Sequence, residues 1–314
     1  MPLLLRTLLD TALAVTAAPL LAGWIEVCRA RLQNRRSAGV LQPYRMIGKL
    51  LHKDAVIAHG ASALFRASPY LQLGAMVLAA AIIPTFGAQA LLGTAADTIA
   101  LVGVFAIARV MLALAAMDIG TAFGSLGARR EMLIGFLSEP ALLMVFFTAS
   151  MISGSTLLPT IIAALAHAHL TIYPSLAFAA VAFVMVLLAE NARIPIDNPS
   201  THLELTMIHE ATALEYSARH LALLEWTGAL KLLNYMAIGI ALFVPWGLSL
   251  PGTGIASLAS TWLLAAVKLA AAGAGLALIE TLSAKLRLFR APEFLATAFL
   301  LAVLGLLVHL LLEA

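Results

Sequence analysis

Residues 190–216 read ENARIPIDNPSTHLELTMIHEATALEY, a polar block set between long apolar runs. The block holds acidic residues, an arginine and two histidines, although 62% of the chain is hydrophobic. Over the whole chain 11% of residues are charged and the mean hydropathy is +0.99, whereas soluble domains carry about 25% charged residues. The apolar runs are therefore expected to lie in a bilayer, and the polar block is where functional residues are expected.

Inside lipid, an unpaired backbone group costs several kcal/mol, so the spanning segments are expected to be helices. The apolar runs are long and uninterrupted, which does not fit the alternating strands of a membrane β-barrel. We predict an all-α integral membrane protein in which residues 1–314 form a single membrane domain.

About eight transmembrane helices are expected, and the polar block is predicted to be a cytoplasmic loop between helices five and six. An amphipathic helix at the membrane interface is expected within Arg29–Arg66, and a glycine-rich loop over Asp118–Glu131. The apolar segment Thr156–Leu170 has about 15 residues, too few to span, and is expected to be re-entrant or interfacial. The expected spans are Leu3–Val27, Pro69–Leu92 with a kink at Pro84, Thr98–Met117, Met132–Ser153, Ile172–Ala189, Ala229–Leu248, Ile255–Leu278 and Phe294–Leu312.

The loops after helices one, three, five and seven carry nearly all the lysine and arginine. Basic loops stay in the cytoplasm, so both termini are expected outside and the polar block inside. The net charge of +3 is explained by these loops and does not indicate a nucleic-acid partner.

Charged residues inside the apolar runs are a second signal, because a charge at mid-bilayer costs about 2.5–3.5 kcal/mol. Arg109 and Glu139 lie at matching depth on consecutive helices, which predicts an ion pair. Lys268 lies nearest the midplane and is a candidate proton carrier. Lys231 and Glu280 lie close enough to the inner face for their side chains to reach it.

Within the polar block, Pro199 suits the first turn of a helix that would place Glu204 and Glu215 on one stripe. The two carboxylates would be roughly 16 Å apart along the axis, a spacing that suits a relay through water. Glu190 and Glu139 would continue such a path into the bilayer. The alternative is a solvated helix on the cytoplasmic surface.

Covalent chemistry is not expected on this chain. The sequence His209-Glu210 begins like a zinc-protease motif, but the second histidine is replaced by Ala213. The single cysteine, Cys28, cannot form an internal disulfide or supply the four thiolates of an iron–sulfur cluster. We therefore expect no metal ligands and no cofactor-binding residues here, so any redox centre would belong to another subunit.

The motif Glu190-Asn-Ala-Arg193-Ile-Pro195-Ile-Asp197, followed by Glu204-Leu205 and Glu215-Tyr216, resembles the subunit 1 family of respiratory complex I. The run to His209-Glu210 and the sequences at 41–44, 68–70, 118–132 and 139–140 are similar to the membrane subunits of formate hydrogenlyase and hydrogenase-4 within that family. The resemblance covers most of the chain.

This resemblance implies a membrane anchor and proton-coupling subunit of a bacterial or archaeal NiFe hydrogenase complex in the cytoplasmic (inner) membrane. The implied partners are a hydrogenase large subunit with the NiFe centre, a small subunit with 4Fe–4S clusters, and an antiporter-like membrane subunit. The implied proton path comprises Glu139, Glu190, Glu204, Glu210, Glu215 and Lys268. The implied charge partners and docking residues are Arg109, Asp118, Arg130, Arg193 and Asp197.

Two other functions stay open from the sequence. The chain resembles the quinone-site subunit of complex I, but Ser200 and His202 stand where complex I relatives carry further acids, and a short insertion precedes Glu215. These departures favour the hydrogenase reading. A stand-alone ion transporter and a passive anchor are alternatives of other classes.

Overall fold

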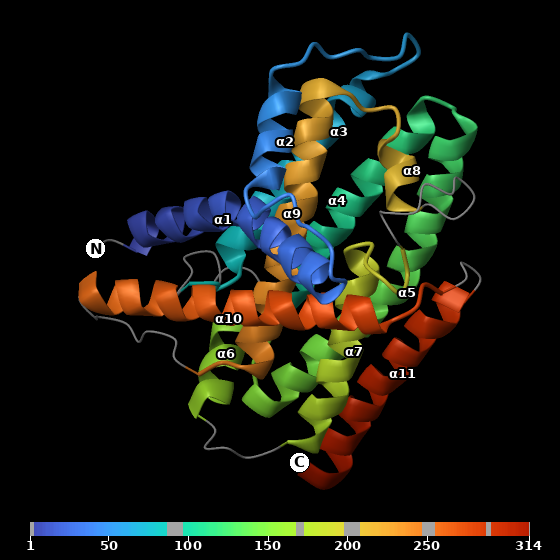
Figure 1. The fold of residues 1–314 in the computed structure, drawn as a ribbon. Helices are drawn as coiled ribbons and strands as arrows, with labels where there is room; N and C mark the ends of the chain where they lie inside the picture. The colour runs from blue at the N-terminus through green and yellow to red at the C-terminus, as the bar shows by residue number, and fades with distance from the viewer. Residues whose placement is uncertain are drawn as a thin grey trace.

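The computed structural model describes residues 3–86, 97–167, 173–197, 208–246, 255–286 and 290–313, and these ranges are helical, with no strand among them. Figure 1 shows the arrangement of the elements. The helices are α1 (Leu3–Leu32), α2 (Gln42–Leu51), α3 (Ala63–Ile82), α4 (Thr98–Asp118), α5 (Ala122–Ser153), α6 (Leu158–His167), α7 (Pro174–Glu190), α8 (His209–Ala213), α9 (Ala218–Phe243), α10 (Ile255–Leu282) and α11 (Ala291–Val308), which a π-helical turn, His309–Glu313, extends.

Within the described residues, seven helices are long and apolar enough to cross a bilayer: α1, α3, α4, α5, α9, α10 and α11. The apolar helix α7 is shorter, with 17 residues. The ten residues of α6 extend about 15 Å, half of the roughly 30 Å hydrocarbon core. The chain is therefore an all-α, multi-pass membrane protein, and the expectation that Thr156–Leu170 is too short to span agrees with α6.

Three helix starts follow from side chains that accept a backbone N–H. Ser62 Oγ accepts from Leu64 at the start of α3, and Asp97 Oδ1 accepts from Ala100 at the start of α4. Thr121 Oγ1 accepts from Gly124 at 3.3 Å and starts α5. Such caps satisfy donors that the first helical turn leaves unpaired. The expected glycine-rich loop over 118–131 is therefore wrong, because α5 already begins at Ala122.

Two other expected boundaries were displaced. Helix α3 ends at Ile82, so Pro84 lies beyond the helix and does not kink it. Helix α9 begins at Ala218, eleven residues before the expected start at Ala229 (229 − 218 = 11). The expected amphipathic helix is present as α2, on which Ile47 is buried and Leu51 is exposed.

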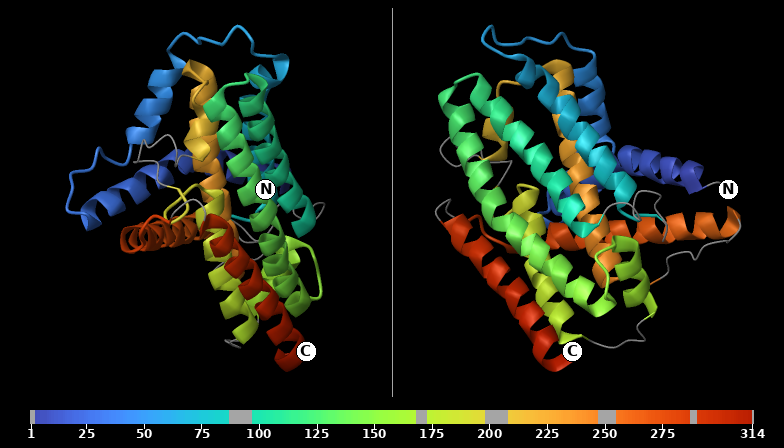
Figure 2. Two further views of the ribbon diagram at one scale, coloured as in Figure 1. Left: turned by 90° about the vertical axis from the view of Figure 1, so that its right-hand side faces the viewer. Right: turned by 180° about the vertical axis from the view of Figure 1, so that it is seen from behind.

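The helices form two packed groups that meet where α4 lies against α5 and where α7 lies against α9 (Figure 1). Helices α5, α7 and α11 pack together at the end of the molecule where the C-terminus lies, as the view from behind in Figure 2 shows. Helix α3 packs between α4 and α9, while α1 and α10 lie side by side across the other helices. This arrangement brings the C-terminal end of α7 close to α4, α5 and α9, where the buried charges lie.

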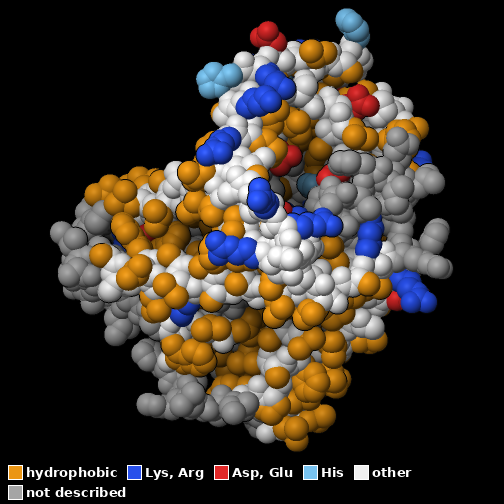
Figure 3. Space-filling model, in the orientation of Figure 1, with side chains coloured by type: hydrophobic (Ala, Val, Ile, Leu, Met, Phe, Trp, Pro, Cys, Tyr) orange, Lys and Arg blue, Asp and Glu red, His pale blue; other side chains and the backbone are white. Residues whose placement is uncertain are grey.

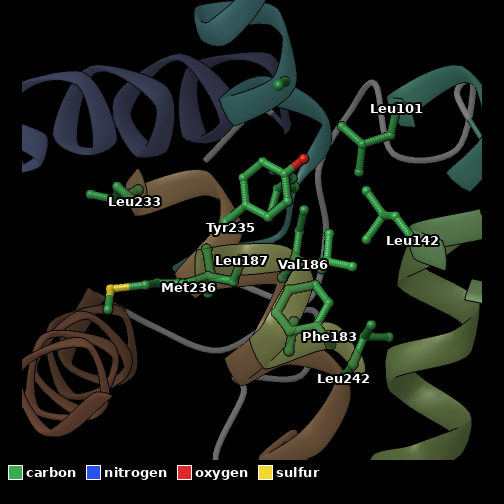
Figure 4. Packing of buried hydrophobic residues seen from close by; sticks show 14 of the residues in the cluster. Leu101, Leu142, Phe183, Val186, Leu187, Leu233, Tyr235, Met236 and Leu242 are labelled. Carbon is green, nitrogen blue, oxygen red and sulfur yellow. The ribbon is translucent and has the colours of Figure 1, made fainter. Parts of the chain in front are cut away.

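Large apolar side chains from four helices fill the centre of the molecule (Figure 4). Tyr235 on α9 is fully buried, and its ring stacks on Phe105 of α4 with centroids 4.8 Å apart. Phe183 of α7 packs near the same ring, and Leu142 comes from α5. This core fixes the relative positions of the helices that carry the charged side chains.

Candidate functional site: a buried arginine shared by three carboxylates

Arg109 on α4 is the centre of a buried ion-pair cluster, and only 4% of the residue is exposed. Its Nη1 atom donates to Glu139 on α5, and its Nη2 atom donates to Glu190 at the end of α7. Glu131 on α5 lies 3.9 Å from the Nε atom. One guanidinium thus holds carboxylates from two helices, and the ion pair predicted between Arg109 and Glu139 is confirmed.

Glu190 also binds a second cation. Lys231 Nζ on α9 lies 3.0 Å from Glu190 Oε2, and Ser138 Oγ donates to Glu190 Oε1. The cluster contains three carboxylates and two cations, so its formal charge is −3 + 2 = −1 when all are ionised. A net charge in a low-dielectric interior is costly, and taking up one proton removes it.

Gly135 on α5 makes the approach of Arg109 possible. A Cβ atom at this position would lie 2.6 Å from Arg109 Cδ and 2.8 Å from Arg109 Cζ. Both distances are well inside van der Waals contact, so a larger residue would push the guanidinium away.

A cavity of 340 Å³ opens beside the cluster. Its walls come from α1, α2, α9, α8 and the turn after α7, and both Glu190 and Lys231 line it. Figure 3 shows acidic and histidine side chains recessed among lysines and arginines on the upper part of this face, above an apolar lower part. The cavity therefore connects a polar surface with the buried cluster.

A smaller cavity of 40 Å³ lies deeper, with Arg109 and Glu131 in its lining. Both cavities are lined by His209, Ala213, Leu224, Gly228 and Lys231. The arrangement offers water-sized spaces between titratable groups, which is what proton transfer through a membrane domain requires.

A family model described as NADH dehydrogenase matches residues 6–311 of the chain. The chain belongs to the NADH dehydrogenase family of complex I subunit 1 proteins. Two relatives in Escherichia coli (strain K12) have sequences similar to this member of the family. Formate hydrogenlyase subunit 4 is 34% identical over 301 residues, 96% of this chain and 97% of the relative. Hydrogenase-4 component C is 31% identical over 246 residues, 78% of this chain and 76% of the relative.

A solved structure has the same fold as this subunit 1 family member. A chain in the structure of the membrane-bound sulfane sulfur reductase, an archaeal respiratory membrane complex, aligns with a TM-score of 0.84 at 21% identity. The alignment covers 98% of this chain and 99% of the other. The family and the two relatives make this chain a membrane subunit of a complex I-like enzyme.

A second charge group in this family member surrounds Glu280 of α10, which is 2% exposed. Arg193 Nη1 lies 3.2 Å from Glu280 Oε1, and Arg29 Nη1 lies 3.6 Å from Glu280 Oε2. Arg29 also pairs with Glu26 at 2.6 Å. The expectation that Glu280 reaches the inner face is wrong, because α1 and the turn after α7 bring two arginines to it.

Lys231, whose side chain was also expected to reach the inner face, pairs with Glu190. The early start of α9 at Ala218 places Lys231 thirteen residues into the helix (231 − 218 = 13), where it reaches Glu190. Lys268 does not join the cluster: its Nζ atom donates to the carbonyl oxygens of Val244, at 2.7 Å, and Trp246. An ammonium group bound to these carbonyl oxygens stabilises the negative, C-terminal end of the α9 dipole, which is a structural role.

The two aspartates of the predicted docking set bind backbone N–H groups. Asp197 Oδ2 accepts from Ile208 at 3.1 Å and from His209 at 3.3 Å, and Lys285 lies 3.8 Å from Oδ1. Asp118 Oδ2 accepts from Ser62 at 2.9 Å. Asp197 thus joins the end of the turn after α7 to the start of α8.

The remaining predicted site residues have mixed positions. Glu204 and Pro199 lie outside the described residues. Glu210 lines the larger cavity, whereas Glu215 lies beyond the end of α8 at Ala213, so the two do not continue along one described helix. Arg130 lines an apolar pocket of 190 Å³ between α5 and α11, away from the Arg109 cluster.

Tyr216 is the last residue of the polar block and joins it to α3. Its hydroxyl donates to the carbonyl oxygen of Phe65 at 3.0 Å, and the two rings stack 4.0 Å apart. Burial raises the pKa of Tyr216 to about 12, so the phenol keeps its proton and its hydrogen bond at neutral pH.

Sequence reasoning missed Glu131, Gly135 and Lys231 as members of the cluster. A stripe on α5 contained the signal, because Glu131, Gly135 and Glu139 follow each other at intervals of four residues and share a helix face. Among the described residues, no group of three or more His, Cys, Asp or Glu side chains is placed to hold a metal ion.

Proposed function

We propose that this chain is the membrane anchor and proton-coupling subunit of a membrane-bound NiFe hydrogenase complex of the formate hydrogenlyase type. The two relatives, a formate hydrogenlyase subunit and a hydrogenase-4 component, support the type of complex. The Arg109 cluster carries the coupling half of the proposal.

The charge balance of the cluster supports a proton-carrying role. Three carboxylates share two cations, with Arg109, Glu131 and Glu190 buried and Glu139 half-buried, so the cluster has an unbalanced negative charge when fully ionised. A change of charge at the neighbouring 340 Å³ cavity would alter the cost of that imbalance, and with it the proton occupancy of Glu139 or Glu190. A redox step in a partner subunit could therefore drive proton movement here without covalent chemistry on this chain.

The cytoplasmic surface supports the anchoring half. Residues 31–39, at the end of α1 and in the loop before α2, are exposed and include Arg31, Arg35 and Arg36. By the positive-inside rule this loop faces the cytoplasm, which places both termini outside the cytoplasmic (inner) membrane. The partners proposed for this side are a large subunit with the NiFe centre and a small subunit with 4Fe–4S clusters. An antiporter-like subunit is the proposed partner within the membrane.

The test of the coupling role is Glu139→Gln in the assembled complex. We expect hydrogen formation from an artificial electron donor to be retained and proton movement in sealed vesicles to fall, because the amide cannot exchange a proton. The same result is expected for Glu204→Gln. Glu293→Gln, on the exposed first turn of α11, is the matched control. Unchanged proton movement in Glu139→Gln would refute the role.

The anchoring half has a separate test. Arg193→Ala removes a cation from Glu280 and from the wall of the larger cavity. We expect a larger share of hydrogenase activity in the soluble fraction than in the wild type. Activity that stays wholly with the membrane would exclude a contribution of this turn to docking.

A quinone-binding subunit is the second candidate, and the larger cavity is the observation that favours it. Ligand pockets typically have volumes of about 300–1,000 Å³, and this one has 340 Å³ with Met46, Ile47 and Leu221 in its lining. Quinone-dependent activity that quinone-site inhibitors abolish would favour this candidate. Ion movement by the purified chain alone in liposomes would instead favour a stand-alone transporter.

A further inference from the structure

The larger and smaller cavities are separated by a wall that contains two titratable side chains among the described residues, His209 and Lys231. Lys231 is already bound to Glu190 at 3.0 Å and belongs to the cluster. His209 is the first residue of α8 and belongs to the part of the wall that the polar block forms. A proton that passes from the larger cavity to the smaller one therefore meets His209.

The main chain of His209 is fixed independently of its ring. Its N–H donates to Asp197 Oδ2 at 3.3 Å, and its carbonyl oxygen accepts from Thr212 Oγ1 at 2.6 Å. These bonds hold the residue at the wall and leave the imidazole nitrogens for other partners. A histidine in this position is the side chain whose ordinary pKa lies closest to neutral pH.

The spaces on both sides suit water. A water molecule occupies about 30 Å³ in the liquid, so the smaller cavity of 40 Å³ fits one and the larger cavity of 340 Å³ fits several. Arg109 and Glu131 line the smaller cavity, and Glu26 and Glu225 line the larger one. Acidic groups therefore lie on both sides of the imidazole.

We propose that His209 passes protons between the two cavities, an inference that rests on the proposed coupling function. One ring nitrogen accepts a proton from water in the larger cavity, which forms the imidazolium. The other nitrogen then releases a proton to water in the smaller cavity, and the ring returns to its neutral form. No electron moves and no bond to carbon changes, so the step needs no further reactant.

The field around the imidazole comes from several elements. The charged groups that line the two cavities together with His209 are Glu26 on α1, Arg109 on α4, Glu131 on α5, Glu190 on α7, Arg193 and Asp197 in the turn that follows, Glu210 on α8, and Glu225 and Lys231 on α9. Six of these nine groups are acids, so the walls of the two cavities are mainly acidic.

The test uses the whole complex in sealed vesicles, with reduced methyl viologen as electron donor. In His209→Gln we expect proton movement per hydrogen formed to fall by about tenfold or more, with hydrogen formation unchanged. In Thr212→Val the bond to the His209 carbonyl is lost but the imidazole remains, so proton movement should persist. His52→Gln, at an exposed position directly after α2, controls for the loss of a histidine elsewhere.

A second variant covers the case in which His209→Gln does not assemble. His209→Glu supplies a proton carrier with a lower pKa, so the pH at which proton movement is half-maximal should shift downwards. An unshifted profile overturns the inference, as does a Thr212→Val complex that loses as much proton movement as His209→Gln. If the wild type and His209→Gln complexes move protons equally well, the inference about His209 fails but the proposed coupling function stands. A wild type that moves no protons overturns the proposed function with it.

Discussion

Substitution of Gly135 by alanine tests the geometry of the buried cluster without removing any charge. The new methyl group would lie 2.6 Å from Arg109 Cδ and 2.8 Å from Arg109 Cζ. Carbon atoms in contact are about 3.5–4.0 Å apart, so the guanidinium must retreat by about 1 Å. Its hydrogen bonds to Glu139 and Glu190 cannot both survive such a shift.

The expected cost follows from the bonds that are lost. A hydrogen bond to a charged group contributes about 1.5–3 kcal/mol, and inserting a methyl group into a packed interior costs about 1–3 kcal/mol. We expect Gly135→Ala to destabilise the chain by about 3–5 kcal/mol, the range observed when a buried ion pair is broken.

Thermal unfolding of the purified complex, followed by tryptophan fluorescence, measures this cost. Gly103→Ala is the matched control, because Gly103 lies on the same helix as Arg109 and a Cβ there meets no atom within 4 Å. The control should unfold at or slightly above the wild-type temperature, since alanine favours helix formation over glycine. If the two variants unfold alike, Arg109 is not held against Gly135 as described.

Two further predictions concern the ends of the polar block. Asp197→Ala removes the acceptor for the backbone N–H of Ile208 at the start of α8. It should cost about 1–2 kcal/mol and increase the rate of limited proteolysis at α8. A cleavage rate equal to that of the wild type would contradict this. Tyr216→Phe keeps the stack on Phe65 but removes a hydrogen bond, which should cost about 1 kcal/mol. Because the folded-state pKa of Tyr216 is raised to about 12, its contribution is complete below pH 10 and is lost between pH 10 and 12, so Tyr216→Phe should flatten the fall in stability across that window.

The helical membrane fold could be predicted from the sequence because it depends on composition and run length. Apolar runs of about 20 residues leave little choice of structure in a bilayer, and the ion pair of Arg109 with Glu139 followed from depth alone. Helix ends were harder to place. Thr121 starts α5 within what reads as a glycine-rich loop, and α9 begins in a stretch that contains Arg219 and Glu225.

The rest of the cluster could not be predicted because it depends on how helices distant in sequence pack. Glu190 and Lys231 are far from Arg109 along the chain: Glu190 reaches Arg109 from the end of α7, and Lys231 reaches Glu190 from α9. Glu280 illustrates the same limit. Its position near a helix end suggests contact with the surface, but the neighbouring arginines arrive from α1 and from the turn after α7.

The guanidinium of Arg109 binds acidic side chains on both α5 and α7, so these two helices depend on the same cation. Protonation of Glu139 weakens its ion pair with Arg109, while the ion pair of Arg109 with Glu190 persists. Helix α5 then keeps only the longer contact of Glu131 with the guanidinium, whereas α7 stays bound to α4 through Glu190. Protonation of Glu139 would in this way change how tightly α5 is bound to α4, and the effect would extend to whatever packs against the other end of α5.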